Sequence, residues 1–400
     1  MAILNKDNFP YILSWGDPSK IENISIEYKK DGYPVFPCYN FDDADYWFVG
    51  ILNGDALYHY PLKTLVPHDI LVKIRQGEVK LVICNNHEPY HDIIDGIYKY
   101  VVMGANILPT SIVVLSSSYD LHKEVRCVSN KYNLGEIKAV YIREFEYDAQ
   151  TYIKNIDKSI LPKTLESKTY HKKFLSFNGL YRPHRASIVS LLSAYNVLDL
   201  GYVSYNSMPN QNLSTFNIYQ DLLEYHKHNP EFLDLLTKQK DYIFNLQKIS
   251  LDTDQDSHRD MAQYSKKPNH MYEETYFSIV TETVCFTRGS SAGFSGVGRL
   301  LSEKTFKPII FKHPFVIAGV SGCVKQLKDL GYKTFSPYID ESYDDITDDS
   351  ARILKIGKEV QRLASLSETQ LQEFLEFCRE ITDYNYNHLL NLTDLHKKLN

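Results

Sequence analysis

The feature that most constrains the fold is a regular alternation of apolar runs and helix-like segments along residues 46–145. Four runs have the β-branched and aromatic character of strands: 46–52, 79–84, 111–118 and 137–145. Segments with helical periodicity separate them, and residues 91–105 are expected to form one of these helices. Polar and apolar residues do not alternate within them, which is typical of strands buried on both faces. The pattern therefore predicts a parallel sheet covered by helices on both faces.

The same alternation resumes after a polar, proline-containing stretch at about 150–171, which we interpret as a linker. A strand is expected at 172–179, followed by a helix, and the alternation returns from residue 275 onward after a polar segment and continues through 332–336. Residues 349–364 are expected to form a helix of the C-terminal tail. The chain length suits two domains. We predict an α/β protein with two Rossmann-like domains and an interdomain cleft: residues 1–165, and residues 166–400 with a helical insertion at about 206–275 and a helical C-terminal tail.

Composition excludes several classes of protein. No apolar run of about 18 residues could cross a bilayer, and the first residues lack the basic and apolar regions of a signal peptide. The six cysteines are scattered without a CxxC pair, and the net charge of −6 gives no overall basic surface for nucleic acid. The 14 histidines form no HExxH motif, so no metal site is expected. These features predict a cytoplasmic protein without a membrane span.

The stretch FLSFNGLYRPHR, residues 174–185, is the first of three candidate binding motifs. A strand leads into Asn178, and a helix then opens with Arg182, Pro183 and Arg185. Proline suits the first helical position, and the N-terminus of a helix favours an anion. Arginines add charge-assisted contacts to phosphate. The motif predicts a phosphate site, and a solvated basic helix start is the alternative.

The second motif, FSIVTETVCF at 277–286, places Thr281 and Glu282 at the end of an apolar strand. A carboxylate there could bind hydroxyl groups of a sugar or ribose, or it could cap a loop or helix. The third motif is LLSEKTFKPIIFKHPFVIAG at 300–319, where Ser302 is a candidate N-cap. Glu303 and Lys304 would occupy the first turn, and we expect Pro308 to interrupt the helix.

Lys304 is unfavourable at the positive end of a helix dipole, and a bound anion would offset that cost. The alternative is that Glu303 complements the dipole and Lys304 lies in solvent. Together the three motifs predict a nucleotide site, with arginine and lysine for a diphosphate and glutamate for the ribose diol. The sequence has neither GxGxxG after its first strand nor a P-loop.

Two further stretches carry weaker signals. The glycine-rich residues 289–299 are either a lid or a plain surface loop. The acidic run 340–349 lacks the spacing of a calcium loop and is interpreted as a solvated loop.

The motifs TYFSIVTET, LLSEKTFKPIIFKHPFVIAG and KKFLSFNGLYRPHR resemble the donor-binding signature of the fucosyltransferases of glycosyltransferase family 10. The segments EKTFKPI, HPF, GYKTF and DESYD resemble more closely a group of phage-encoded glycosyltransferases. The resemblance covers about residues 172–360. The first half resembles no family that we can name, and the insertion departs from the fucosyltransferase pattern.

The resemblance implies a GT-B glycosyltransferase, with the donor in the C-terminal domain and the acceptor in the N-terminal domain. Arg185 and Lys304 would contact the diphosphate of a GDP- or UDP-sugar, Glu303 would hold the ribose, and Glu282 would lie near the transferred sugar. Such enzymes usually work without a metal ion. The other predicted donor-site residues are Asn178, Arg182, Thr281 and Lys307.

An inverting transfer would need a general base on the acceptor side. The candidates lie in CNNHEPYHD, residues 84–92, at the end of a predicted strand: Glu88 first, with His87 and His91 as reserves. An ordinary loop with a helix cap is the alternative interpretation of this segment.

Several acceptors are compatible with the sequence. If the chain is phage-encoded, one is a hydroxymethylated pyrimidine of DNA such as 5-hydroxymethylcytosine, with YHKK (170–173) and YSKKPNH (264–270) contacting phosphates. A glycan or a lipid-linked acceptor is an alternative, and so is a non-catalytic nucleotide-sugar-binding protein. The sequence leaves the sugar and the oligomeric state open.

Overall fold

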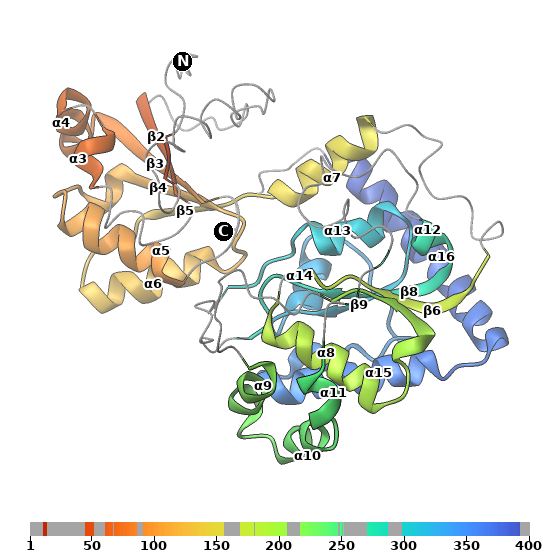
Figure 1. The fold of residues 1–400 in the computed structure, drawn as a ribbon. Coiled ribbons are helices and arrows are strands. Elements are labelled where there is room, and N and C mark those ends of the chain that lie inside the picture. Colours follow the sequence, from red (N-terminus) through yellow and green to blue (C-terminus); the bar gives the residue numbers. More distant parts are fainter. Residues whose placement is uncertain are drawn as a thin grey trace. The chain divides into compact units, whose positions relative to one another are not determined.

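The computed structural model describes residues 11–13, 45–51, 61–66, 68–85, 91–155, 169–179, 181–205, 217–246, 249, 251, 270–286 and 298–392. The chain is an α/β protein with two parallel sheets (Figure 1), which confirms the predicted class. It divides into two compact units. Unit 1 comprises Met1–Glu144, Gly296–Leu300 and Asp394–Asn400, and unit 2 comprises Phe145–Ser295 and Leu301–Thr393.

The first boundary between the units follows Glu144, whereas we expected it at residue 165. The strand predicted at 137–145 ends at Tyr141, and helix α7 (Glu144–Asn155) begins almost at once. Side chains of α7 bond to unit 2: Gln150 donates to the carbonyl of Leu390, and Glu146 accepts from the Tyr332 hydroxyl. These contacts explain why α7 belongs to the second unit.

The sheet of unit 1 contains five parallel strands in sequential order. They are β1 (Tyr11–Leu13), β2 (Asp45–Ile51), β3 (Val79–Asn85), β4 (Ile112–Ser116) and β5 (Lys138–Tyr141). Its helical elements are α3 (Leu62–Leu65), α4 (His68–Gln76), α5 (His91–Gly96), the π-helix η1 (Ile97–Met103), the short 3-10 helix η2 (Pro109–Ser111) and α6 (Leu121–Tyr132).

The described helices of unit 1 pack on one face of this sheet, whereas we expected helices on both. Leu81 and Ile83 of β3 share one core with Ile112 and Val114 of β4, together with residues of α3, α4, α5, η1 and α6. Right-handed crossovers that always step in the same direction along a sheet leave their helices on the same side. The sequential strand order therefore accounts for the difference.

The sheet of unit 2 contains four parallel strands in the order β7-β6-β8-β9. They are β6 (Lys172–Ser176), β7 (Gly201–Val203), β8 (Thr275–Thr281) and β9 (Phe315–Ala318). The chain steps from β6 to β7 on one side and then returns to place β8 and β9 on the other side of β6. The strand order thus reverses between β6 and β8.

This reversal places helices on both faces of the second sheet (Figure 1), with α8 and α15 on one face and α13 and α16 on the other. The helical elements of unit 2, besides α7, are α8 (Pro183–Ala194), η5 (Leu198–Leu200), α9 (Ile218–His226), α10 (Pro230–Lys238), α11 (Lys240–Phe244), α12 (His270–Glu273), α13 (Glu303–Ile310), α14 (Cys323–Asp329), η7 (Glu341–Asp345), α15 (Asp349–Ala364) and α16 (Glu368–Leu390).

The predicted insertion contributes α9, α10 and α11, and α9 is fastened to α8 and α15 through His226. This histidine is fully buried and stacks on Phe232 with 3.6 Å between ring centroids. Ser187 donates to the Pro183 carbonyl, so its oxygen accepts from Nε2 of His226 at 2.8 Å. Nδ1 then accepts from Ser350 at 2.9 Å. Both ring nitrogens are satisfied in the neutral form, and burial lowers the pKa of His226 to about 3.

Because His226 binds its proton more weakly when folded than when unfolded, stability should fall with decreasing pH. The contribution of the neutral ring is complete above the unfolded-state pKa of about 6.5 and is lost progressively toward pH 3. Between pH 7.5 and pH 5, urea denaturation should show a loss of about 2 kcal/mol attributable to this group. His226→Gln should flatten the pH dependence, and His228→Gln, at an exposed position two residues away, should not. Parallel curves for wild type and His226→Gln would contradict this assignment.

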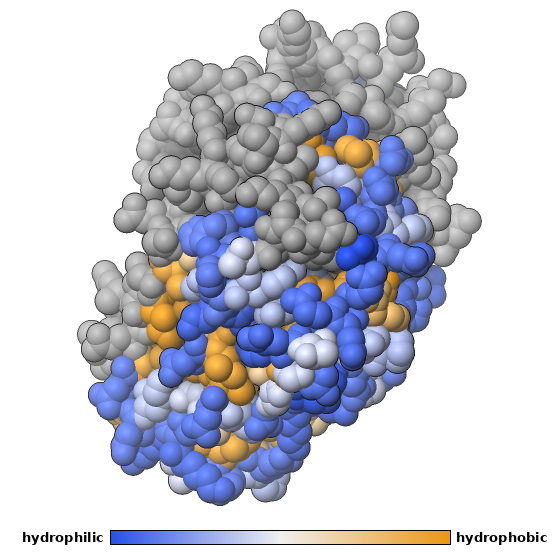
Figure 2. Space-filling model, turned by 90° about the vertical axis from the view of Figure 1, so that its right-hand side faces the viewer, coloured by the Kyte–Doolittle hydropathy of each residue, from blue (hydrophilic) through white to orange (hydrophobic). Residues whose placement is uncertain are grey.

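Hydrophobic side chains on the face shown in Figure 2 are interspersed among hydrophilic ones. The largest exposed hydrophobic side chains of the described residues come from different elements and loops: Met103, Leu108, Leu200, Phe244, Tyr338 and Tyr384. Among the helices within the described ranges, none combines the length and hydrophobicity that crossing a bilayer requires.

Candidate functional site

The reversal of strand order in unit 2 marks the position of the candidate site. In open α/β sheets, ligands bind outside the carboxyl ends of the strands where the strand order reverses. Here that position lies between the ends of β6 and β8. The N-terminus of α8 follows β6, and that of α13 lies on the connection from β8 to β9. All the predicted donor-site residues belong to these segments.

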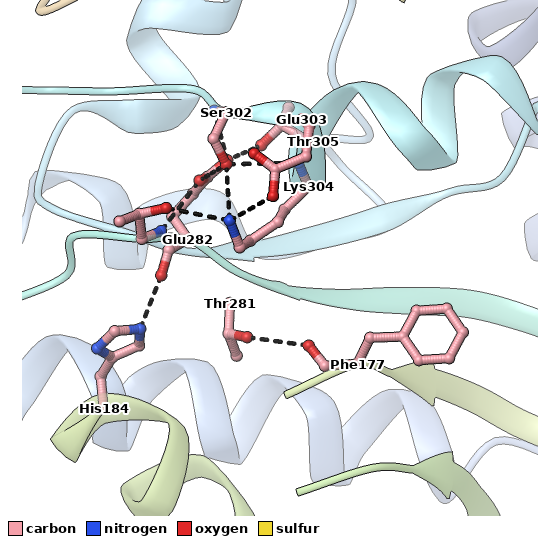
Figure 3. Close-up of polar contacts among 9 residues, drawn as sticks. Phe177, His184, Thr281, Glu282, Ser302, Glu303, Lys304 and Thr305 are labelled. Carbon is pink, nitrogen blue, oxygen red and sulfur yellow. Dashed lines mark hydrogen bonds and ion pairs between the residues drawn. The ribbon is translucent and has the colours of Figure 1, made fainter. Parts of the chain in front are cut away.

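Asn178 and Thr281 join the two strand ends at the base of the site. Thr281 donates its hydroxyl to Oδ1 of Asn178 at 3.0 Å and also lies 3.3 Å from the Phe177 carbonyl (Figure 3). The side-chain Nδ2 of Asn178 donates to the Ser176 hydroxyl, and the backbone N–H of Asn178 donates to the hydroxyl of Ser204, which follows β7. Both side chains are almost fully buried, so in this structure they hold the edge of the sheet together.

Glu282, predicted to lie near a transferred sugar, has a fully buried carboxylate that binds the start of α13 (Figure 3). Oε1 accepts from the Ser302 N–H at 3.1 Å and from the Thr305 hydroxyl at 2.5 Å. Oε2 accepts from the Ser302 hydroxyl at 2.5 Å and from the Thr283 N–H at 3.2 Å. A carboxylate is the group that the positive end of a helix favours. Glu282 thus acts here as the cap that the sequence left as an alternative.

The predicted N-cap of α13 is confirmed, because the Ser302 side chain accepts from the backbone N–H of Lys304. Lys304 lies in the first turn and pairs with its neighbour, with 2.6 Å between Nζ and Oε1 of Glu303 (Figure 3). Nζ also donates to the Thr283 hydroxyl at 3.0 Å. The side chains of Lys304 and Glu303 are 25% and 16% exposed, so this pair is the solvent-accessible part of the first turn.

The charges of Glu303, Lys304 and Lys307 are coupled. Burial raises the pKa of Glu303, but Lys304 and Lys307 more than offset it and hold that pKa at about 2. Burial lowers the pKa of Lys307 to about 8, with Glu303 opposing the shift and Lys304 adding to it. Near neutral pH, the first two turns of α13 therefore carry one carboxylate and two cations. Their net charge is positive.

His184 shows that the cations of α8 and α13 converge. Its Nε2 donates to the backbone carbonyl of Glu282 at 2.8 Å (Figure 3). The pKa of His184 is well below its usual value, first because the ring is buried and then because Arg185, Arg182 and Lys304 are close. The neutral histidine therefore lies near three cations and also beside Glu282, whose carboxylate is bound to the start of α13.

The two helices present different N-termini to this region. The first turn of α13 is already satisfied by Glu282, whereas α8 begins at Arg182 without a side-chain cap and with Pro183 in the first turn. The insertion supports α8, because Tyr181 just before it donates to Asp221 of α9 at 2.5 Å. An anion bound here would meet the start of α8 and the side chains of Arg185 and Lys304.

The structure brings together eight residues that the sequence predicted for the site, all within or beside these strand ends: Asn178, Arg182, Arg185, Thr281, Glu282, Glu303, Lys304 and Lys307. Glu88 and His87 lie outside the described residues. His91 begins α5 in unit 1. His184 was quoted in the motif but not predicted to act, although its position between two arginines in RPHR is a signal that could have drawn attention to it.

The acidic run 340–349 was interpreted as a solvated loop, and the structure agrees only in part: Asp345 and Asp348 are exposed, but Glu341–Asp345 form the 3-10 helix η7. Asp344 is buried, and its carboxylate accepts from the N–H groups of Val324 and Lys325 at the start of α14. Asp348 caps α15 by accepting from the Ala351 N–H. The run therefore supplies helix caps. Within the described ranges, no three acidic, histidine or cysteine side chains are grouped as a metal site would require.

Comparisons with known proteins do not identify a family. No protein-family model matches the chain, and no curated protein resembles it significantly in sequence. Among solved structures, one similar chain is the N-terminal domain of the Candida albicans trehalose-6-phosphate phosphatase. The two share 9% sequence identity with a TM-score of 0.40, over 94% of this chain and 76% of that one. A similarity of this degree carries no argument about function.

Proposed function

We propose that this protein is a glycosyltransferase that takes its sugar from a nucleotide-diphosphate donor bound at the carboxyl edge of the second sheet. The observation that carries the proposal is that the starts of α8 and α13 meet at Glu282. His184 of α8 donates to the Glu282 carbonyl at 2.8 Å, and the Glu282 carboxylate accepts from Ser302 at the start of α13, so Arg182, Arg185 and Lys304 lie in the first turns of two neighbouring helices. A diphosphate leaving group accumulates negative charge as its bond to the sugar breaks. Fixed cations and a helix N-terminus in a site with little water stabilise that charge.

The roles of the residues follow from their charge and from the sequence resemblance, with Lys304 partly exposed and Arg185 buried. Lys304 and Arg185 would contact the diphosphate, and Glu303 would accept hydrogen bonds from the ribose hydroxyls once Lys304 turns toward the phosphates. The acceptor hydroxyl would attack the anomeric carbon and give its proton to a base. Glu88 is the proposed base, with His87 as reserve. Asn178, Thr281 and Glu282 would not contact the donor. They would hold the strand ends and the start of α13 in place around it.

The rest of the proposal follows the sequence resemblance: a GT-B architecture, inversion at the sugar carbon and a GDP- or UDP-sugar as donor. Reversal of the strand order in unit 2 is compatible with a Rossmann-like donor domain. The proposed acceptors are a hydroxymethylated pyrimidine of DNA, or a glycan or lipid-linked acceptor. A non-catalytic nucleotide-sugar-binding protein is the competing function, and it would neither hydrolyse a nucleotide sugar nor transfer its sugar.

A thermal-shift panel of GDP-, UDP-, ADP- and CMP-sugars tests the proposal, and at least one of them should raise the melting temperature. Lys304→Ala should weaken binding of that nucleotide by about 10- to 100-fold, because a charged hydrogen bond contributes roughly 1.5–3 kcal/mol. Lys325→Ala is the matched control, since Lys325 is exposed on α14 and pairs with Asp329. If no nucleotide stabilises the protein, or if Lys304→Ala responds as wild type does, the proposed donor site is wrong.

A further inference from the structure

The inserted helices of unit 2 are fastened to the rest of that unit at three places. Helix α9 is joined to Ser187 of α8 through His226, and to the residue before α8 through Asp221. Further along the insertion, the backbone of Ile249 pairs with that of Tyr205, two residues after the end of β7, with N···O distances of 2.8 and 2.9 Å. All of these residues belong to unit 2. Two of the three contacts flank the first turn of α8.

The contact before the first turn of α8 joins Tyr181 to Asp221. The Tyr181 hydroxyl donates to Oδ2 of Asp221 at 2.5 Å, a length typical of a hydroxyl bonded to a carboxylate. Tyr181 is 2% exposed. Burial raises the pKa of Tyr181 and the charge of Asp221 adds to that shift, so the hydroxyl keeps its proton and remains a donor. Arg182, at which α8 begins, follows Tyr181 directly.

The contact after the first turn joins His226 to Ser187. Nε2 of His226 donates to the Ser187 hydroxyl at 2.8 Å, and that hydroxyl donates to the Pro183 carbonyl at 2.8 Å. His226 lies five residues after Asp221 on α9, and Ser187 lies six residues after Tyr181. The two contacts are therefore more than one helical turn apart along α9. Two contacts at this separation fix the direction of α9 along the start of α8 as well as its position.

Arg182 and Arg185 lie between these two contacts. The Arg182 carbonyl accepts from the backbone N–H groups of Arg185 at 3.0 Å and Ala186 at 3.1 Å, and these bonds close the first turn. No side chain of the described residues caps this helix end. His184 adds a bond to the Glu282 carbonyl at 2.8 Å. The place of the first turn thus depends on the end of β8 and on α9.

We propose that Asp221 is a positioning residue for the donor site: by binding Tyr181 from the first turn of α9, it fixes the start of α8 so that Arg182 and Arg185 are presented to the diphosphate. The part of this inference that concerns the diphosphate rests on the proposed function. The part that concerns the order of the first turn does not. Asp221 does not touch the donor in this scheme, and the insertion gains a defined role, which is to hold the donor-binding helix.

Amide hydrogen exchange and nucleotide binding together test the proposal, with Tyr181→Phe and Asp221→Ala as variants. Tyr181→Phe removes only the hydroxyl and keeps the ring, so it is the milder change should Asp221→Ala not fold. Each variant should accelerate exchange of the Arg185 and Ala186 amides about fivefold or more in the ligand-free protein, because both amides bond to the Arg182 carbonyl. Amides of β8 should keep their wild-type protection.

Tyr202→Phe is the matched control. The Tyr202 hydroxyl on β7 also donates to a carboxylate, that of Glu274, at 2.6 Å. Glu274 directly precedes β8, at the amino edge of the sheet, so this variant loses the same kind of bond away from the start of α8. Exchange of the Arg185 and Ala186 amides should be unchanged. If folded Tyr181→Phe protects both amides as wild type does, or if Tyr202→Phe loosens them equally, the positioning role is wrong.

Nucleotide affinity distinguishes this inference from the proposed function. For the nucleotide sugar that stabilises wild type, Tyr181→Phe should raise the dissociation constant about fivefold or more, and Tyr202→Phe should leave it unchanged. A merely structural role for Tyr181 would lower the urea midpoint without changing affinity. Normal nucleotide binding by Tyr181→Phe would reject the positioning role and leave the donor site in place. If no nucleotide binds wild type, the donor site is wrong, and the exchange rates alone decide whether Asp221 orders the start of α8.

Discussion

A Glu282→Gln variant should lose about 2–4 kcal/mol of stability and most of its affinity for the donor nucleotide. Four donors point at the two carboxylate oxygens of Glu282, two from backbone N–H groups and two from hydroxyls. Glutamine has one acceptor oxygen, and its amide would direct further N–H groups at the remaining donors. Unsatisfied buried polar groups cost about 1–3 kcal/mol each. The first turn of α13, which carries Glu303 and Lys304, should loosen as a result.

Urea denaturation and nucleotide titration measure the two effects of Glu282→Gln. The matched control is Glu376→Gln on α16, because the side chain of Glu376 is 67% exposed and pairs with Arg379 at the surface. That variant should lie within about 0.5 kcal/mol of wild type. If the Glu282→Gln protein were as stable as the control, the Glu282 carboxylate would not be what stabilises the first turn of α13.

Replacement of Arg352 by alanine should be the most destabilising single change in unit 2, by about 3–5 kcal/mol. Arg352 is 1% exposed and lies on α15. Its guanidinium donates to the carbonyls of Gly319 beyond β9, Cys285 beyond β8 and Ile346, and it pairs with Asp349 at 2.6 Å. Arg352→Ala would leave these acceptors without their donor and a charged Asp349 without its partner.

The effect of Arg352→Ala can be separated from any general effect of losing a charge on α15. Lys358→Ala removes an ion pair with Glu231 from the same helix, where both side chains are about half exposed. Surface pairs of this kind contribute roughly 0–1 kcal/mol. Thermal and chemical denaturation should therefore distinguish the two variants clearly. Equal stability of both would mean that the Arg352 contacts contribute little.

Hydrophobic periodicity and capping residues were sufficient to predict several helices and strands. Helix α15 was expected at 349–364, where the structure has Asp349–Ala364, and the strand expected at 79–84 is β3, Val79–Asn85. In both, hydrophobic periodicity and the bounding residues agree. Ser302 was recognised as an N-cap from its place before the first turn alone. Pro308 was expected to interrupt α13, but the helix continues to Ile310 and ends there.

Tertiary contacts decided the elements that the sequence misjudged. Residues 91–105 were expected to form one helix, but a π-helix occupies Ile97–Met103. The Tyr98 hydroxyl in this segment donates to the Gly135 carbonyl and accepts from the Ile137 N–H, which are distant in sequence. Residues 332–336, expected to continue the alternation, form no strand. Thr334 and Phe335 there bond to the Glu341 side chain instead.

The sequence located the candidate site but did not reveal what each of its residues contacts. Strand-end positions identified Thr281 and Glu282, because the carboxyl ends of parallel strands meet at one edge. The partners of Glu282 lie 20 and 23 residues away along the chain, at Ser302 and Thr305, and no local pattern reveals a contact at that separation. The same limit applies to the ion pair between Asp120, in the loop from β4 to α6, and Arg299, because the two residues are 179 positions apart in the sequence.

That separation also has a consequence for biosynthesis. The ribosome adds roughly 5–20 residues per second, so about 10–35 s pass between the synthesis of Asp120 and that of Arg299. During this interval the loop between β4 and α6 has been synthesised, but the Asp120 carboxylate lacks the Arg299 guanidinium with which it pairs. The N-terminal unit therefore cannot complete its fold in the order in which it is translated. Its final closure depends on a segment encoded within the other unit.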